Sequence, residues 1–207
     1  MRAVTWGVGI VVAAGVALVA YAVYAGAQKR AQQRQVMAMV QDSTDKLREA
    51  LTQKANPDLI TALDANLSAP RAPRDPQLSD GAEQYLLSAR EIARRRAEAD
   101  RLWARALGSR QALAYHMARA ERRSESWLRS AVTLKKKVED DYFDLTTNLK
   151  ALDELLYKLP DAEKRLEPRV GAAPLLERTT IDAARTQAQA DLQRANDELA
   201  AARRVVP

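Results

Sequence analysis

Residues 127–159 read WLRSAVTLKKKVEDDYFDLTTNLKALDELLYKL, and this stretch decides the fold of the chain. Large apolar side chains recur along it at steps of three, four or seven positions, which places them on one face of an α-helix. We call this face the leucine seam, and its members are Trp127, Leu134, Val138, Tyr142, Leu145, Leu149, Leu152, Leu156 and Leu159. One amphipathic helix is not stable alone in water, because burial must offset the cost of ordering its residues. The seam therefore predicts a covering helix, from the same chain or from a partner.

The helix that carries the seam can be extended toward the N-terminus as far as residue 82. Residues 82–159 contain no proline and one glycine, Gly108, and they are rich in Ala, Leu, Arg, Glu and Lys. These residue types lose least on entering a helix. Asp80, followed by Glu83, resembles a capping box that would start the helix. We predict one long helix through Gly108, with a break at Gly108-Ser109 as the alternative.

A second helix is predicted after Pro160, which we expect to end the first one. We predict this helix over residues 175–204. Its apolar stripe at helical spacing is formed by Ile181, Ala184, Ala188, Leu192, Ala195, Leu199, Ala202 and, just beyond the helix, Val206. The simplest packing folds this helix back, antiparallel, onto the seam from Val138 to Leu159. Residues 90–137 would then extend further and need a partner.

Residues 3–27 are uncharged and mostly Val, Ala, Gly and Ile. A helix of this length is about 37 Å long, which exceeds the roughly 30 Å of a membrane's hydrocarbon core. Trp6 lies near one end, and Tyr21 and Tyr24 lie near the other, as in an aromatic belt. We predict a transmembrane anchor in contact with membrane lipid. A cleaved signal peptide is the alternative, because Ala25-Gly26-Ala27 has the form of a cleavage site.

The membrane side of the body is not fixed by the flanking charges. Lys29, Arg30 and Arg34 follow the apolar stretch, which would favour a cytoplasmic body. A short N-terminal head before a signal-like segment favours export instead. We predict a single-pass protein of a bacterial inner membrane with a periplasmic body, and we keep the cytoplasmic placement as the alternative.

Residues 28–80 connect the anchor with the long helix. We predict juxtamembrane helices over residues 28–67, with a break before Pro57, and a short apolar seam formed by Met37, Val40, Thr44, Leu47 and Leu51. Residues 68–80 contain three prolines and are predicted to be a linker. The predicted fold is thus all-α: an anchor at 1–27, juxtamembrane helices at 28–67, this linker, and a helical hairpin or coiled coil at 81–207.

Positive charge is concentrated in residues 90–137, which contain 14 Lys or Arg residues against 5 Asp or Glu. Acidic residues of 138–207 would neutralise this segment in an antiparallel bundle; the alternative is contact with anionic lipid, an envelope polymer or nucleic acid. The candidate anion contacts are Arg94, Arg95, Arg96, Arg122, Arg123, Lys135, Lys136 and Lys137. Nucleic acid is disfavoured, because these residues spread around the helix and Trp103 and Trp127 fall near its apolar face.

No motif in the sequence indicates catalysis. The chain has no cysteine and one histidine, His116, so a thiolate site or a two-histidine metal site within one chain is excluded. Glu139, Asp140 and Asp141 are consecutive and radiate around a helix instead of converging. We expect no cofactor, no metal and no enzyme activity.

These patterns predict a non-enzymatic membrane protein that is structural or an adaptor. It would bind a partner protein, or a second copy of itself, through the leucine seam. Two alternatives remain: an all-helical sensor or ligand-binding bundle outside the cytoplasm, and a tether to anionic lipid or nucleic acid through residues 90–137.

Overall fold

A computed structural model describes residues 2–52, 57–69, 76–119, 124–166 and 178–204, and the side chains of these except residues 2–20, 76–79, 178 and 179. All regular secondary structure in this part is helical, which confirms the all-α prediction. The helices are α1 (Arg2–Thr52), α2 (Pro57–Ser68), α3 (Pro76–Ala118), α4 (Glu125–Glu163) and α5 (Arg178–Arg203).

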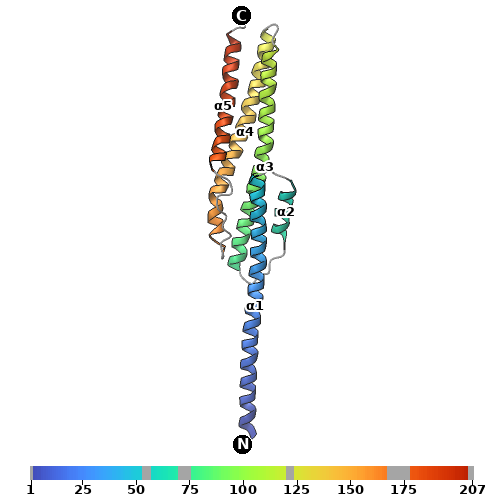
Figure 1. Cartoon of the computed structure of the whole chain (residues 1–207), viewed down its shortest axis with the longest axis vertical. Coiled ribbons are helices and arrows are strands. Elements are labelled where there is room, and N and C mark those ends of the chain that lie inside the picture. The colour runs from blue at the N-terminus through green and yellow to red at the C-terminus, as the bar shows by residue number, and fades with distance from the viewer. Residues whose placement is uncertain (1, 53–56, 70–75, 120–123, 167–177, 205–207) are drawn as a thin grey trace.

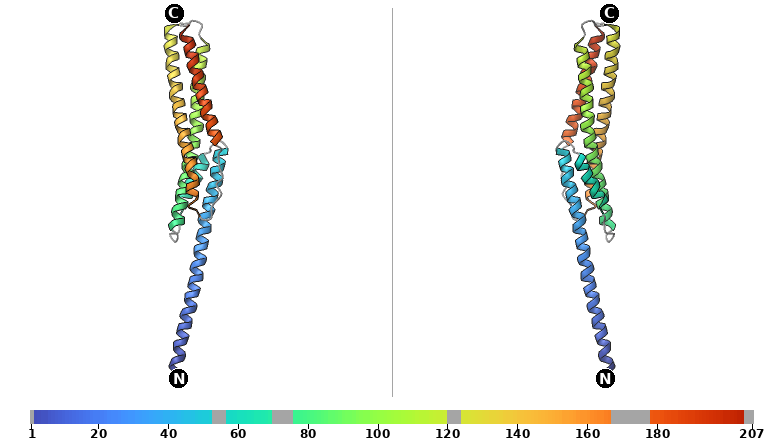
Figure 2. Two further views of the ribbon diagram at one scale, coloured as in Figure 1. Left: turned by 90° about the vertical axis from the view of Figure 1, so that its left-hand side faces the viewer. Right: turned by 90° about the vertical axis from the view of Figure 1, so that its right-hand side faces the viewer.

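The molecule is a long rod built on an antiparallel hairpin of α3 and α4 (Figure 1). The N-terminal part of α1 projects alone from one end, which we call the base. The C-terminus lies at the opposite end, which we call the tip (Figure 1). Near the base, α1 and α2 pack against α3, and toward the tip α5 runs antiparallel to α4 (Figure 2). Only α3 touches all four other described helices, so it is the centre of the bundle.

The core lies where the hairpin covers its own apolar faces. Val138 and Leu145 of the leucine seam are completely buried, and Leu152 is 1% exposed. α3 also buries several small residues, which allow the helices around it to approach closely; they are Ala82, Ala89, Ala93, Ala99 and Ala106. The covering helix that the seam predicts therefore comes from the same chain, and α5 adds to it.

The prediction of one helix over 82–159 was wrong. The helix does pass through Gly108, but α3 ends at Ala118 and α4 begins at Glu125. Ser124 caps α4, because its hydroxyl accepts a hydrogen bond from the Trp127 backbone N–H at 3.2 Å. The physical reason for the reversal is burial: α3 and α4 can cover one another only if the chain turns back. For the same reason, α3 is not an extension that reaches beyond the bundle.

Two helix ends also differ from the expectations. α3 begins at Pro76, so Asp80 lies within the helix instead of capping it, and residues 76–80 of the predicted linker are helical. Pro at the first helical position is favourable, since its missing N–H would have no helical partner there; residues 70–75 lie outside the described part. The expectation that Pro160 ends the helix was wrong: α4 continues through Pro160 to Glu163, although proline there lacks the N–H that would bond the carbonyl of residue 156. The start of α2 at Pro57 is as predicted.

α1 is a single helix of 51 residues that enters the bundle from the base. Its last turns bury Val40, Leu47 and Leu51, and Thr44 bonds the Tyr85 hydroxyl of α3 at 2.7 Å. No helix is long and apolar enough to cross a membrane among the residues that could be tested. Most of the predicted anchor at 3–27 falls on residues 2–20, whose side chains lie outside the described part.

At the base, the first turns of α3 meet the end of α4. A Cβ atom added at Gly81 would lie 2.7 Å from the backbone oxygen of Arg165. Arg165 also donates a hydrogen bond to the Gln84 side chain. Glycine is thus needed here for close approach of two backbones.

Candidate functional site

The leucine seam is internal to the bundle. Six of its residues are buried, and Trp127, Leu134 and Leu156 are partly buried; the six are Val138, Tyr142, Leu145, Leu149, Leu152 and Leu159. In the folded chain α3 and α5 cover this face, so little of it is left to meet a partner protein or a second copy.

Tyr142 is held in the seam by a polar contact with α5. Its hydroxyl donates a hydrogen bond to Asp191 Oδ2 at 3.2 Å. Burial of the phenol, together with the negative charge of Asp191, raises the pKa of Tyr142 to about 12. A buried tyrosine that remains protonated and donates to a carboxylate indicates a structural link between helices, not an acid–base site.

The candidate anion contacts are not gathered into one patch. Arg95 donates to Glu91 at 3.0 Å and to Asn148 at 3.3 Å, while Arg96 pairs with Asp100. Lys135 pairs with Glu139, and Arg94, Lys136 and Lys137 are exposed. Arg122 and Arg123 lie outside the described residues.

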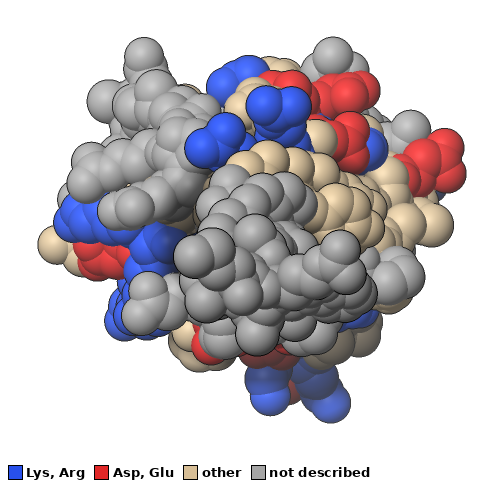
Figure 3. All heavy atoms as spheres, turned by 90° about the horizontal axis from the view of Figure 1, so that it is seen from below, with Lys and Arg blue, Asp and Glu red and all other residues tan. Residues whose placement is uncertain are grey.

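Other basic residues of α3 pair with acidic residues of the neighbouring helices. Asn148, beside Arg95, lies about 18 Å along α4 from Lys136, so the two basic triplets are separate. Arg105 pairs with Asp141 and Asp144, and Arg110 pairs with Glu198, so basic residues of α3 meet acidic residues of α4 and α5. Seen from the base, positive and negative side chains are interspersed (Figure 3).

His116 and Trp127 form a clasp across the turn at the tip. Their rings stack with centroids 5.6 Å apart. The Trp127 indole N–H donates to His116 O at 3.2 Å, and His116 Nε2 lies 3.0 Å from Trp127 O. Because a carbonyl oxygen only accepts, Nε2 carries the proton in this contact. Among the residues that the structure describes, no group of three His, Asp or Glu side chains could hold a metal ion.

Two aromatic side chains stand on the outer surface of α4. Phe143 is 69% exposed and Tyr157 is 73% exposed. Shallow grooves lie on both sides of Phe143, one toward α5 and one toward α3. The spacing analysis missed these residues, because it follows the apolar face that repeats and passes over single aromatic positions beside it.

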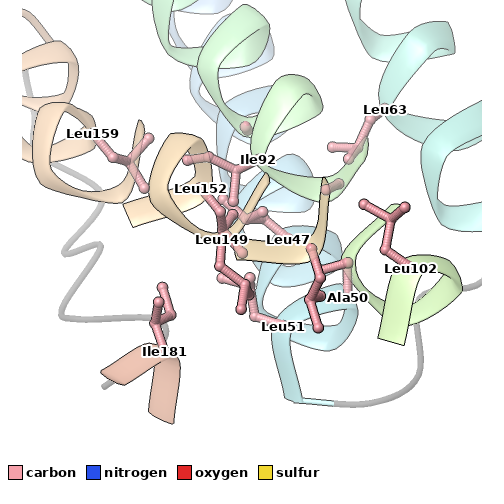
Figure 4. Close-up of a cluster of buried hydrophobic side chains, with 14 of the residues drawn as sticks. Leu47, Ala50, Leu51, Leu63, Ile92, Leu102, Leu149, Leu152, Leu159 and Ile181 are labelled. Carbon is pink, nitrogen blue, oxygen red and sulfur yellow. The ribbon is translucent and has the colours of Figure 1, made fainter. Parts of the chain in front are cut away.

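A cavity of about 340 Å³ lies where α1 ends and α5 begins, and we call it the junction cavity. Four helices line it, with Leu51, Arg96, Ala99, Asp100, Trp103, Leu145, Leu149, Leu152, Thr180, Ile181, Ala184 and Gln187. Figure 4 shows Leu51, Leu149 and Leu152 pointing toward one another, with Ile181 to one side on α5. Sequence reasoning missed the cavity, because each of its apolar residues reads as an ordinary core position.

The chain was compared with protein-family models, curated proteins and solved structures, and none of these matches it.

Proposed function

We propose that the chain is a single-pass membrane protein whose helical bundle stands on the membrane as a rod and binds partner proteins without catalysis. The observation that carries the proposal is the continuity of α1. Its first half contains the uncharged stretch 3–27, and its second half packs in the bundle core at Val40 and Leu47. No loop separates the apolar stretch from the body.

The exposure of large side chains on the projecting part of α1 supports a membrane environment. Tyr21, Val23 and Tyr24 are 69%, 67% and 62% exposed. Large apolar and aromatic side chains on an isolated helix are unfavourable in water and favourable at the edge of a bilayer. The length of the uncharged stretch, about 37 Å as a helix, is sufficient to cross it.

The proposed geometry gives the rod a definite reach. If the anchor ends at residue 27, about nine residues of α1 lead to the base, which adds roughly 13 Å. α3 then runs for roughly 64 Å from base to tip. The tip would thus stand about 75–80 Å from the membrane. This length suits a structural or adaptor role, in which the protein holds a partner at a set distance from the membrane and catalyses no reaction.

The partner surface in this proposal is the outer face of α4, since the leucine seam is covered. Phe143 and Tyr157 are exposed aromatic residues, a type that is enriched among the residues that dominate interface energies. Tethering to nucleic acid or anionic lipid through residues 90–137 has less support, because Arg95, Arg96 and Lys135 are paired within the bundle.

The anchor is tested by fractionation of bacterial cells that express the full chain. We expect it in the membrane fraction, resistant to an alkaline carbonate wash, and we expect a chain that lacks residues 2–27 to be released. Recovery of the full chain in the wash would overturn the anchor.

The membrane side is tested by single-cysteine labelling, since the chain has no native cysteine. Ser124, exposed at the tip, is replaced by cysteine and treated in intact spheroplasts with a membrane-impermeant maleimide. Labelling is expected for a periplasmic body, and labelling only after lysis would place the body in the cytoplasm. Arg2→Cys, at the other end of the anchor stretch, is the control and should show the opposite pattern.

A further inference from the structure

We propose that the junction cavity is a binding site for a small uncharged amphiphile, with an apolar body and a single hydroxyl or carbonyl group. This goes beyond the proposed rod, which requires no ligand. The reason for the cavity is the architecture of the bundle. α1 covers the hairpin on the base side and ends at Thr52, while α5 covers it on the tip side and begins at Arg178. Between these two ends, side chains of α3 and α4 line an unfilled space.

The size and walls of the cavity set the class of ligand. An apolar cavity of about 150 Å³ holds one benzene-sized molecule, so 340 Å³ suits a molecule of roughly twice that size. Leu51, Leu149 and Ile181 form apolar walls, and they are only 2–5% exposed. Trp103 adds an aromatic surface from α3. Such walls favour a ligand with an apolar body.

The polar groups of the lining favour an uncharged ligand. Arg96 and Asp100 lie on one side and form an ion pair with each other, so they add no net charge. Gln187, on α5, donates a hydrogen bond to Asp191 at 3.1 Å, which leaves its amide oxygen as the acceptor that it can offer. Thr180 contributes a hydroxyl from the first turn of α5. One ligand hydroxyl or carbonyl can therefore be satisfied, whereas a ligand charge would meet only the Arg96–Asp100 pair, which already neutralises itself.

The test uses the full chain in lipid nanodiscs, with 8-bromo-1-octanol as the probe and Trp103 as the reporter. Bromine quenches a tryptophan on contact, and the changes Trp6→Phe and Trp127→Phe leave Trp103 as the one tryptophan of the chain. We expect saturable quenching by the alcohol. 8-Bromooctanoate, which has the same chain and a negative charge, should bind at least tenfold more weakly. Equal or tighter binding of the carboxylate would overturn the assignment to an uncharged ligand.

Two variants that fill the cavity complete the test. Ala184→Phe and Ala99→Leu each add volume to a lining position, and Ala200→Phe is the matched control at an exposed position of α5. Circular dichroism identifies which variants are folded. A folded filling variant should lose saturable quenching by at least tenfold, while the control should not.

Three results would overturn the binding site. The first is the absence of saturable quenching in the chain without a filling substitution. The second is a folded filling variant that binds the bromoalcohol as tightly as that chain does. If both filling variants unfold, the binding site is tested by competition in the chain without a filling substitution. Unbrominated octanol should then protect Trp103 from the bromoalcohol, and the absence of this protection is the third result.

Discussion

Two glycines of α3 have opposite surroundings, although both lie in helical backbone. Gly81 faces the backbone of Arg165 at the base, whereas an added Cβ at Gly108 meets nothing within 4 Å. The sequence alone treats both as weak points of a helix. The structure shows that only Gly81 is required for packing.

Gly81→Ala is therefore expected to destabilise the bundle. The new Cβ would lie 2.7 Å from Arg165 O, so a backbone must move, and a net loss of about 1–2 kcal/mol in the free energy of unfolding is expected after the gain in helix propensity. Gly108→Ala is the matched control and should stabilise by up to about 1 kcal/mol. Chemical denaturation followed by circular dichroism measures both, and equal effects of the two changes would show that the contact at Gly81 is unimportant.

Tyr142 gives the bundle a dependence on alkaline pH. Its pKa is about 12 in the folded chain against about 10 when unfolded. Because the folded value is the higher one, the stability contributed by the protonated phenol is complete below about pH 10 and is lost as pH rises from about 10 through 12. Unfolding free energies at about pH 8 and pH 11 should therefore differ less in Tyr142→Phe than in the original chain.

The exposed Tyr157 provides the control for this effect. Tyr157→Phe, at a residue that is 73% exposed, should leave the pH dependence unchanged. The ultraviolet absorbance of tyrosinate offers a second readout, in which Tyr142→Phe removes a late-titrating group. If both variants behave alike, the Tyr142–Asp191 contact does not control the alkaline transition.

At the scale of elements, the spacing of apolar residues predicted which faces are buried better than it predicted where helices end. Leu145, Leu149 and Leu152 are buried as their spacing indicates. The reversal between α3 and α4 was missed, because residues 119–124 contain only Arg, Ala, Glu and Ser and no Pro or Gly. Local propensity there permits a helix, and the decision comes from burial between segments distant in sequence.

The same limit applies to the candidate sites. Leu51 and Ile181 meet at the junction cavity from segments far apart in the chain, and no local pattern links them. Asp191 and Tyr142 are joined only once α5 lies against α4. Sequence reasoning identified the buried faces correctly, but it offered the leucine seam both to residues 175–204 and to a partner, because no local pattern places α3 against it.

The outer face of α4 carries a prediction about partners. A photo-reactive benzoylphenylalanine in place of Phe143 or Tyr157 should form a crosslinked adduct in cells, because these side chains project from the rod. The same residue in place of Thr133, an exposed position of α4 away from both aromatics, should give little adduct. Electrophoresis and mass spectrometry identify the product, including a second copy of the chain. Adducts of equal yield at all three positions would argue against a specific surface.

At the scale of the whole molecule, the bundle is expected to fold without the projecting part of α1. The described apolar core begins at Val36 and Val40, and residues 21–35 make no contribution to it. A chain that lacks residues 2–27 should keep the same helicity in residues 28–207, and its melting temperature should lie within about 3 °C of that of the full chain, a difference of about 1 kcal/mol or less. Aggregation or loss of cooperative melting would show that the body depends on those residues.

The continuity of α1 also fixes how the bundle is rotated relative to the N-terminal stretch of the same helix. Successive residues of an α-helix turn by about 100°, so a continuous helix fixes the azimuth of the bundle relative to the stretch 3–27. One residue inserted between positions 28 and 35 would swing the exposed face of α4 by roughly 100° around the α1 axis, whereas about seven would return it to within about 20°. The continuous α1 therefore fixes both the distance of the bundle from the stretch 3–27 and the direction in which the exposed face of α4 points around the α1 axis.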